Sequence, residues 1–388
     1  MGIEIEFINT GGFEKEDLNM EKPDFADYSP DIEEIRRKAR EHDFKDLVVI
    51  GNGGSVTSFR AYNEALGDKK DKEAHILTTM EPEKVSGLSK RLDPEETLVM
   101  PISKSGETVG VIEDLMHFVE KGFPVFAVTS DNDGALREIV ERKGFDFIEH
   151  PDISGRYTGA TETGLVPAAF MGFDFEGIRQ GAEKMYGKLE QESSNDVKKI
   201  ASVLYSAEQR GLDKVFTPFY STQLFGFYPL LVQLMHETVC KDGKGQTFFG
   251  DVGPECQHHT IQRLFGGKED LVTMLFHVEE HESTFLKVDE ELNDVNVRGR
   301  QLSEFEEADL ADSLRSELSG VREALKSEEM PAFDLKIDKV CPETCGELLA
   351  LLQYTAYYSA GFRGLNPFNQ PDVEKSKKIG IQKRFEGD

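Results

Sequence analysis

The sequence is most constrained by a pattern of strand, turn and helix that occurs twice in its first third. Leu47–Ile50 is a short, continuously apolar run that leads into the turn Gly51-Asn-Gly-Gly-Ser55 and then into a helical stretch. Glu96–Ile102 leads in the same way into Ser103-Lys-Ser-Gly-Glu-Thr108 and a second helical stretch. Continuous apolar strands that alternate with helices are typical of a parallel sheet covered on both faces. We therefore predict an α/β protein in which both turns lie at the carboxyl edge of one sheet.

The rest of the chain indicates a second unit of the same kind, and 388 residues are enough for two domains. Further strand patterns occur at Pro124–Thr129, Lys214–Pro218, Leu271–Val278 and Ala332–Ile337, and helical patterns at 31–42 and 195–210. Residues 302–329 are mostly charged with apolar residues at helical spacing, which predicts a solvated helix pair without a partner. The predicted division is an N-terminal extension (1–44), a first domain (45–187), a second domain (195–365) and a C-terminal segment (366–388), with the join near 187–197.

The charge balance limits the partners. The chain has 73 acidic and 45 basic residues, a formal charge of -28, which repels nucleic acid and anionic lipid surfaces. No apolar run approaches the ~20 residues that cross a bilayer, and the N-terminus lacks the apolar core of a secretory signal, so we expect a cytoplasmic protein. An anionic substrate would need helix N-termini and a few local cations. The cysteines show no C-x-x-C spacing and are expected to be free thiols: Cys240, Cys256, Cys341 and Cys345.

The two turns have the context of anion sites. Each follows a strand and precedes a helix, where backbone N–H groups and the helix dipole attract negative charge. The turn 51–55 lacks the third glycine of a dinucleotide fingerprint. The turn 103–108 offers three hydroxyl groups, which suit a terminal phosphate better than a pyrophosphate. Taken alone, either turn is as consistent with a tight connection as with a ligand site.

Four further motifs follow these turns in a fixed order. They are Ser154-Gly-Arg-Tyr157 with Gly164-Leu-Val-Pro-Ala-Ala169, Gln233-Leu-Met-His-Glu237-Thr-Val-Cys-Lys241, Gly250-Asp-Val-Gly-Pro-Glu-Cys-Gln-His258 and Asn366-Pro-Phe-Asn-Gln370-Pro-Asp-Val-Glu-Lys-Ser-Lys377. The turns resemble the sugar-phosphate loops of the sugar isomerase (SIS) fold, and the later motifs are similar to those of the glucose-6-phosphate isomerases. The resemblance covers residues 45–380 in family order.

The resemblance implies a fold and an activity. The fold would be two doubly wound, three-layer α/β/α domains of the SIS type with parallel five-stranded sheets, and a C-terminal helix that closes over a site between them. The activity would be the interconversion of glucose 6-phosphate and fructose 6-phosphate, without a metal or other cofactor. Family members are commonly homodimers, so His258 would reach the site of the neighbouring subunit.

The chemistry of aldose–ketose isomerisation requires a proton donor for ring opening, a base that moves a proton between carbons, and a cation that stabilises the enediolate. By resemblance, Glu237 is the base, His258 and Lys377 open the ring, and Arg156 faces the enediolate. The residues that would bind the phosphosugar are Gly54, Ser55, Ser103, Lys104, Ser105, Thr108, Gln233 and Gln370. The sequence departs from the family pattern at Glu107, whose carboxylate would repel a phosphate unless it turns away, and at Val239-Cys240, where Asn-Gly is common.

Other interpretations differ in what they require. His277-Val-Glu-Glu-His281 fits a zinc-binding string, but it continues an apolar strand in which positions 277 and 281 would lie about 13 Å apart. We therefore expect no metal there. A related SIS isomerase for mannose 6-phosphate or an amino-sugar phosphate would share most of the motifs. A non-catalytic SIS module that binds a phosphosugar as a signal would need the two turns but has no use for a proton shuttle.

Overall fold

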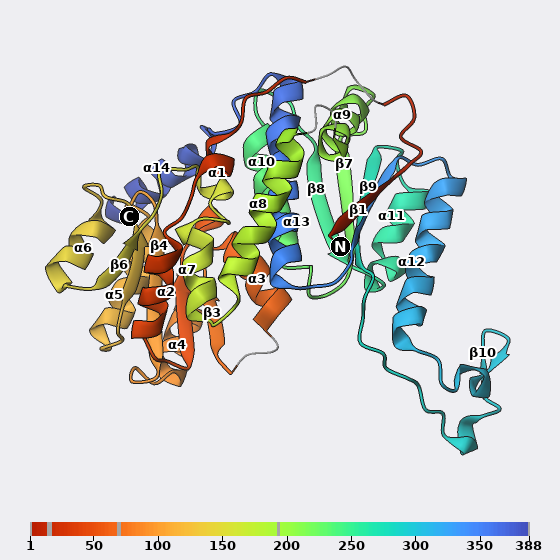
Figure 1. Cartoon of the computed structure of the whole chain (residues 1–388), viewed down its shortest axis with the longest axis horizontal. Coiled ribbons are helices and arrows are strands. Elements are labelled where there is room, and N and C mark those ends of the chain that lie inside the picture. The colour runs from red at the N-terminus through yellow and green to blue at the C-terminus, as the bar shows by residue number, and fades with distance from the viewer. Residues whose placement is uncertain (1, 14–17, 68–70, 192–194, 387–388) are drawn as a thin grey trace.

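The computed structural model describes residues 2–13, 18–67, 71–191 and 195–386. It contains two five-stranded sheets, with a layer of long helices between them and further helices on their outer faces (Figure 1). Within the described ranges, no helix is both long and apolar enough to cross a membrane. The four cysteines are free thiols, as the sequence predicted.

The first sheet is entirely parallel, with the strand order β3-β2-β4-β5-β6. Its strands are β2 (Asp46–Ile50), β3 (Glu73–Leu77), β4 (Thr97–Ser103), β5 (Phe126–Thr129) and β6 (Asp146–Glu149). The order of the strands reverses between β2 and β4, so the turns that follow these two strands lie beside each other. A reversal of this kind leaves a crevice at the carboxyl edge of the sheet, where ligands bind in doubly wound proteins.

Successive residues of β2 face two different cores. Leu47 and Val49 face the helices between the sheets, whereas Val48 and Ile50 face the outer helices. The outer helices are α4 (Pro82–Arg91), α5 (Val109–Glu120) and α6 (Ala135–Lys143). Burial on both faces explains why this strand is a continuous apolar run in the sequence.

The second sheet has the order β1-β12-β9-β7-β8. Its strands are β1 (Ile3–Ile8), β7 (Lys214–Tyr220), β8 (Thr247–Val252), β9 (Leu271–Val278) and β12 (Ala332–Ile337). Four of them are parallel, but β1 pairs antiparallel with β12, so the expectation of a fully parallel sheet is corrected at this edge. β1 lies within the predicted N-terminal extension, and its alternation of apolar and charged residues fits an edge strand with one solvated face.

The layer between the sheets forms one continuous core with their inner faces. Its helices are α1 (Asp24–Asp27), α2 (Ile32–Glu41), α3 (Thr57–Leu66), α7 (Glu162–Phe170), α8 (Phe175–Gln191), α9 (Asp196–Gln209), α10 (Phe227–Val239) and α13 (Pro342–Arg363). α13 packs against α8, α9 and α10 and is buried along nearly its whole length. The predicted join at 187–197 includes residues 192–194, which lie outside the described residues.

The predicted solvated helix pair at 302–329 is wrong. α12 (Leu310–Ser327) is a single helix, and its residues Leu318, Val321 and Leu325 are buried against the outer face of the second sheet. Apolar residues at this spacing form a packing face even where the rest of a helix is charged. The other elements of this region are α11 (Thr260–Gly266), β10 (Asn296–Val297), β11 (Arg300–Gln301) and the short turns η4 (Glu255–His258), η5 (Glu290–Leu292) and η6 (Leu302–Phe305). The β10–β11 hairpin projects away from the body of the protein (Figure 1).

Candidate functional site

A cavity of 970 Å³ lies at the carboxyl edge of the first sheet, beside α10 and the C-terminal helix α14 (Val373–Phe385). Eleven of the twelve residues that the sequence singled out line it; only His258 does not. These eleven are Gly54, Ser55, Ser103, Lys104, Ser105, Thr108, Arg156, Gln233, Glu237, Gln370 and Lys377. Segments more than 300 residues apart in the chain therefore meet at one cavity.

The first glycine turn forms a close backbone contact with the segment that carries Arg156. Gly54 lies in η1 (Gly53–Ser55) and Arg156 in η3 (Gly155–Tyr157). A Cβ atom on Gly54 would lie 2.2 Å from the carbonyl carbon of Gly155 and 2.6 Å from the backbone nitrogen of Arg156. Only glycine permits this approach, so the turn after β2 fixes the position of Arg156 as well as one wall of the cavity.

The second turn presents its hydroxyl groups to the cavity, directly before α5. The hydroxyl groups of Ser103 and Thr108 lie 3.1 Å apart and form a hydrogen bond. Glu107 turns away: its Oε1 accepts a hydrogen bond of 2.9 Å from the backbone N–H of Ala135, the first residue of α6. The carboxylate therefore caps a neighbouring helix and does not line the cavity, which removes the expected conflict with a phosphate.

Helix α10 places Gln233 and Glu237 four residues apart, on the face that lines the cavity. Gln233 Nε2 donates to Glu237 Oε1 at 3.0 Å, while Gln233 Oε1 accepts a hydrogen bond from the hydroxyl group of Thr57 at 2.9 Å. The other carboxylate oxygen of Glu237 accepts from Arg156 Nη1 at 3.1 Å. The carboxylate is thus oriented by one hydrogen bond to each oxygen, and its side chain is 26% exposed.

Arg156 uses all five of its N–H donors on protein oxygens. Nε donates to the Thr238 hydroxyl at 2.8 Å, and Nη1 donates to Glu237 and to Gln370 Oε1, the latter at 2.9 Å. Nη2 donates to the carbonyl oxygens of Pro367 and Asn369. An arginine has five donors, so a substrate oxygen could bond to this guanidinium only by replacing one of these partners.

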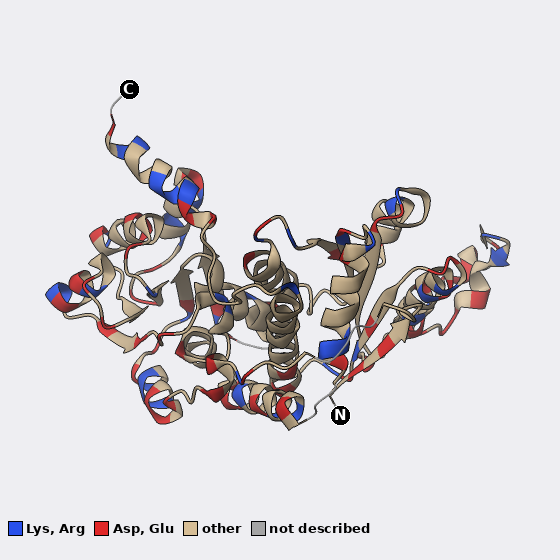
Figure 2. Ribbon diagram, turned by 90° about the horizontal axis from the view of Figure 1, so that it is seen from above, with Lys and Arg blue, Asp and Glu red and all other residues tan. Residues whose placement is uncertain are grey.

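The C-terminal segment closes one side of the cavity. α14 carries five Lys or Arg residues and one Glu in 13 residues, and Figure 2 shows this group of cations on the projecting C-terminal helix. Lys377 Nζ pairs with Glu374 at 2.7 Å, and Arg384 donates to Glu113 of α5. A chain with a charge of -28 therefore brings a local concentration of positive charge to the cavity.

His258 is placed elsewhere. It ends the short turn η4, after β8 in the second sheet, and it is exposed. No other histidine takes its place by the side of Glu237 among the residues described, although His150 lines the cavity on the side of the first sheet. The sequence prediction for His258 is therefore compatible with this single chain only if the residue acts in a neighbouring subunit.

Some cavity residues were not predicted. Ser130 and His150 follow β5 and β6, so they lie at the same carboxyl edge as the two turns, and this position in the strand pattern was the available signal. His150 is buried, and its Nδ1 lies 2.8 Å from the carbonyl oxygen of Pro151. Burial lowers the pKa of His150 to about 4, so its ring is neutral at pH 7.

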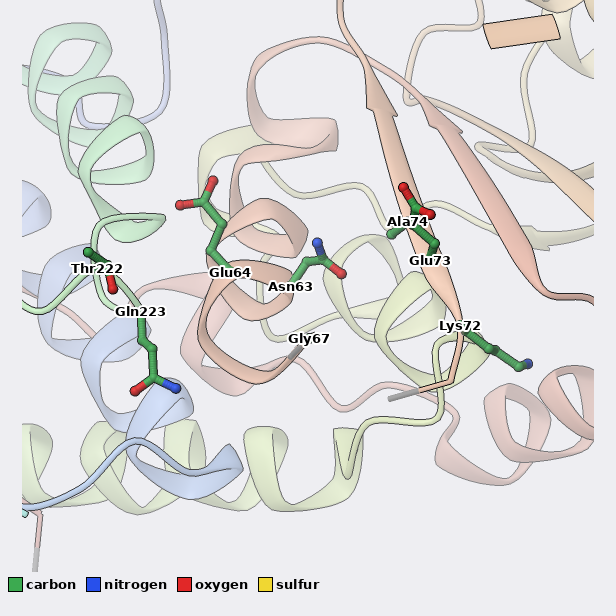
Figure 3. A pocket seen from close by; sticks show the side chains of 8 residues that line it. All are labelled: Asn63, Glu64, Gly67, Lys72, Glu73, Ala74, Thr222 and Gln223. Carbon is green, nitrogen blue, oxygen red and sulfur yellow. The ribbon is translucent and has the colours of Figure 1, made fainter. Parts of the chain in front are cut away.

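A second cavity of 390 Å³ lies between α3, the start of β3 and the loop after β7, and Figure 3 shows the side chains around it. It contains two carboxylates, Glu64 and Glu73, and one cation, Lys72. The Lys72 ammonium donates to the carbonyl oxygen of Phe170 and lies 3.9 Å from the centre of the Phe44 ring. It is therefore already engaged, and an anionic ligand would meet two carboxylates, which makes this cavity unsuitable for a phosphosugar.

Metal-ligating side chains are not grouped in the larger cavity, as far as the described residues go. In that part of the chain one group of three comes together, Asp46, Glu73 and His75, at the opposite end of β2. His75 Nε2 bonds to Asp46 at 2.6 Å, and Arg91 lies 3.3 Å from His75 Nδ1, where a cation would have to bind. The string at 277–281 does not lie on a helix, because β9 includes His277 and ends at Val278.

Comparison with known proteins agrees with this geometry. Residues 34–386 match the family model described as phosphoglucose isomerase. The chain belongs to the phosphoglucose isomerase family. The two doubly wound domains and the C-terminal helix that the resemblance implied are thereby confirmed, apart from the antiparallel edge strand β1.

Relatives in this family are distant in sequence but extend over most of the chain. The glucose-6-phosphate isomerase of Rubrobacter xylanophilus is 26% identical over 372 residues, which cover 89% of this chain and 84% of that protein. The glucose-6-phosphate isomerase of Methanocaldococcus jannaschii is 27% identical over 350 residues, with 87% and 83% covered. Among solved structures, a hypothetical protein from Thermus thermophilus matches with a TM-score of 0.85 at 26% identity, over 98% of this chain and 91% of that one. The chain is therefore a sugar-phosphate isomerase of this family.

Proposed function

We propose that the protein interconverts glucose 6-phosphate and fructose 6-phosphate by moving a proton between C1 and C2 through an enediol or enediolate. The observation that carries this proposal is the position of Glu237, whose carboxylate lines the cavity and is held by Gln233 and Arg156. The names of the distant relatives support the choice of sugar.

In the proposed mechanism Glu237 is the base. A carboxylate that is oriented at both oxygens can remove a proton from one carbon and return it to the next without a change of position. Arg156 supplies positive charge beside the reacting carbons, where the enediolate oxygen develops its charge. Because all five Arg156 donors are occupied, the enediolate oxygen would take the place of Glu237 or Gln370 on Nη1 as the reaction proceeds.

The phosphate would bind at the two turns. The hydroxyl groups of Ser55, Ser103, Ser105 and Thr108 and the first N–H groups of α5 converge at this end of the cavity. Lys104 contributes less charge than its position indicates, because its ammonium pairs with Asp152 at 2.7 Å. Recognition would therefore depend on hydroxyl and amide donors more than on cations.

Ring opening would require groups from outside the first domain. Lys377 on α14 lines the cavity, and its ammonium needs only to leave Glu374 to reach a bound sugar. We infer that the protein is a homodimer in which His258 enters the cavity of the partner, because this histidine is exposed and outside its own cavity. A dilution series that follows the molecular mass together with the specific activity tests this inference.

The function is tested by assaying the purified protein with fructose 6-phosphate and coupling the product to glucose 6-phosphate oxidation, with and without a chelator. Glu237→Gln keeps the shape of the side chain and removes the base, so its activity should fall by about 10²–10⁴-fold with unchanged folding. Glu64→Gln is a matched control, because Glu64 also lines a cavity and lies on a helix. More than a tenth of the original activity in Glu237→Gln would exclude the proposed base.

A further inference from the structure

A buried lysine beside the site has no part in the mechanism described so far. Lys241 lies two residues after α10 and is 8% exposed. In the described part of the chain it forms no ion pair, and its ammonium donates to the carbonyl oxygens of Asn366 and Asn369 and to Asn369 Oδ1, the last two at 2.7 and 3.0 Å. An ammonium has three donors, so all of them are used on one short segment.

The same segment is held by the second buried cation of the site. Arg156 Nη2 donates to the carbonyl oxygens of Pro367 and Asn369, and Nη1 donates to the side chain of Gln370. The Asn369 carbonyl oxygen therefore accepts hydrogen bonds from both Arg156 and Lys241. Two cations buried so close together repel each other, and burial followed by the charge of Arg156 lowers the pKa of Lys241 to about 8. A buried arrangement that is unfavourable in itself persists where it fixes something else.

We propose that Lys241 is a positioning residue that, with Arg156, fixes the segment Asn366–Gln370, so that Gln370 faces the cavity and α14 begins beside it. The segment connects α13 to α14, and four of its five residues bond to one or the other of the two cations. For its kinetic consequences the proposal rests on the proposed isomerase function. Its structural consequence, the order of this segment, does not.

The kinetic test compares two lysines of one loop. Lys241→Met removes the ammonium and keeps the length of the side chain. Lys244→Met is the matched control, because the Lys244 ammonium also donates to a carbonyl oxygen, that of Arg363 at 2.8 Å, but lies outside the cavity. A displacement of about 1 Å in groups that position a substrate can reduce a rate about 10²-fold. We expect kcat/KM for fructose 6-phosphate to fall by about 10- to 100-fold in Lys241→Met and to stay within twofold of the unmodified protein in Lys244→Met.

Inhibition by inorganic phosphate separates positioning from general damage to the site. Phosphate would bind at the two turns, which Lys241 does not contact, so its inhibition constant should be the same in Lys241→Met and in the unmodified protein. A parallel loss of phosphate affinity and of kcat/KM would mean that the substitution disturbs the whole cavity, and it would overturn the proposed role.

The pH dependence gives an independent readout. The charged groups that face Lys241 are Arg156, Asp242 and Glu237. The ammonium loses its proton as the pH rises through about 8, so kcat/KM should decline on the alkaline side with a midpoint near this value. Lys241→Arg keeps the positive charge, and its alkaline decline should move to higher pH. An identical decline in both proteins would contradict the assignment.

Hydrogen exchange tests the proposal without reference to activity. Amides of residues 366–372 should exchange faster in Lys241→Met than in Lys244→Met, whereas those of residues 103–108 should not change. Unchanged exchange at 366–372 would overturn the proposal even if the protein proves to be an active isomerase. If Lys241→Met does not fold, Asn369→Ala removes one of the three acceptors and should produce a smaller increase in exchange at the same residues, and its absence would have the same meaning.

Discussion

Replacement of Gly54 by alanine would place a methyl group against the backbone that carries Arg156. The new Cβ atom would lie 2.2 Å from the Gly155 carbonyl carbon and 2.4 Å from its oxygen, whereas ordinary contacts begin at 3.4 Å. The two backbones would therefore have to separate by about 1.2 Å, because neither atom belongs to a flexible side chain. The displaced segment carries the guanidinium that bonds to both Glu237 and Gln370.

The expected effects follow from this displacement. Forcing a methyl group into a packed contact costs about 1–3 kcal/mol of the free energy of unfolding. A shift of about 1 Å at the site should lower kcat by about 10²-fold, since reacting groups tolerate little misplacement. The assays are thermal unfolding and the coupled reaction with fructose 6-phosphate.

Gly155→Ala is the matched control from the other side of the same contact. Its Cβ atom would meet only the Cα atom of Gly54, at an ordinary distance of 3.8 Å. It should therefore unfold like the unmodified protein and keep its kcat, and any effect should fall on KM because Gly155 lines the cavity. If Gly54→Ala were as stable and as active as Gly155→Ala, the inferred contact between the two turns would be refuted.

Two further predictions concern carboxylates outside the reaction. Glu107→Ala removes the acceptor of the Ala135 N–H and should lower the free energy of unfolding by about 0.5–2 kcal/mol, as the loss of a helix cap does, without changing KM. A lower KM would instead mean that the carboxylate repels the substrate phosphate. Asp114 on α5 is buried, and burial raises its pKa to about 6, above the value in the unfolded chain. Folding therefore favours its protonated form, and this stabilisation is present below about pH 4 and lost as the pH rises through about 6. Asp114→Asn, which stays neutral, should gain stability over the unmodified protein at pH 8 but not at pH 4, and an equal difference at both pH values in urea unfolding would contradict this account.

The strands that the sequence predicted are those buried on both faces. Leu47–Ile50 and Leu271–Val278 are continuous apolar runs, and the structure contains them as β2 and β9. β3 and β6 could not be recognised in this way, because they are outer strands of four or five residues with few apolar side chains. β1 did carry a signal, the alternation of isoleucine and glutamate, but its partner β12 lies more than 300 residues away, and a local pattern contains no information about such pairing.

The candidate site was predictable where motif and strand end coincide. Gly54 and Ser103 follow strands at a reversal of strand order, which the sequence pattern indicated. The roles of Glu107 and Arg156 were not accessible, because they depend on which neighbours the folded chain supplies: an α6 amide for Glu107 and a row of carbonyl oxygens for Arg156. Lys241 could have been singled out by its position four residues after Glu237, which itself follows Gln233 by four, but a lysine at the end of a helix is ordinarily a solvated charge.

The pairing of β1 with β12 determines when this protein can finish folding. The ribosome releases residues 3–8 first, yet their partner at residues 332–337 is synthesised almost last. At about 5–20 residues per second, the first strand waits roughly 15–65 s for its place in the sheet. During that time the first domain can assemble on its own strands, whereas the second must remain an incomplete sheet whose β12 edge, once made, is open until the N-terminus returns to cover it. The N-terminal strand thus acts as the closing piece of a domain that is otherwise encoded by the second half of the message.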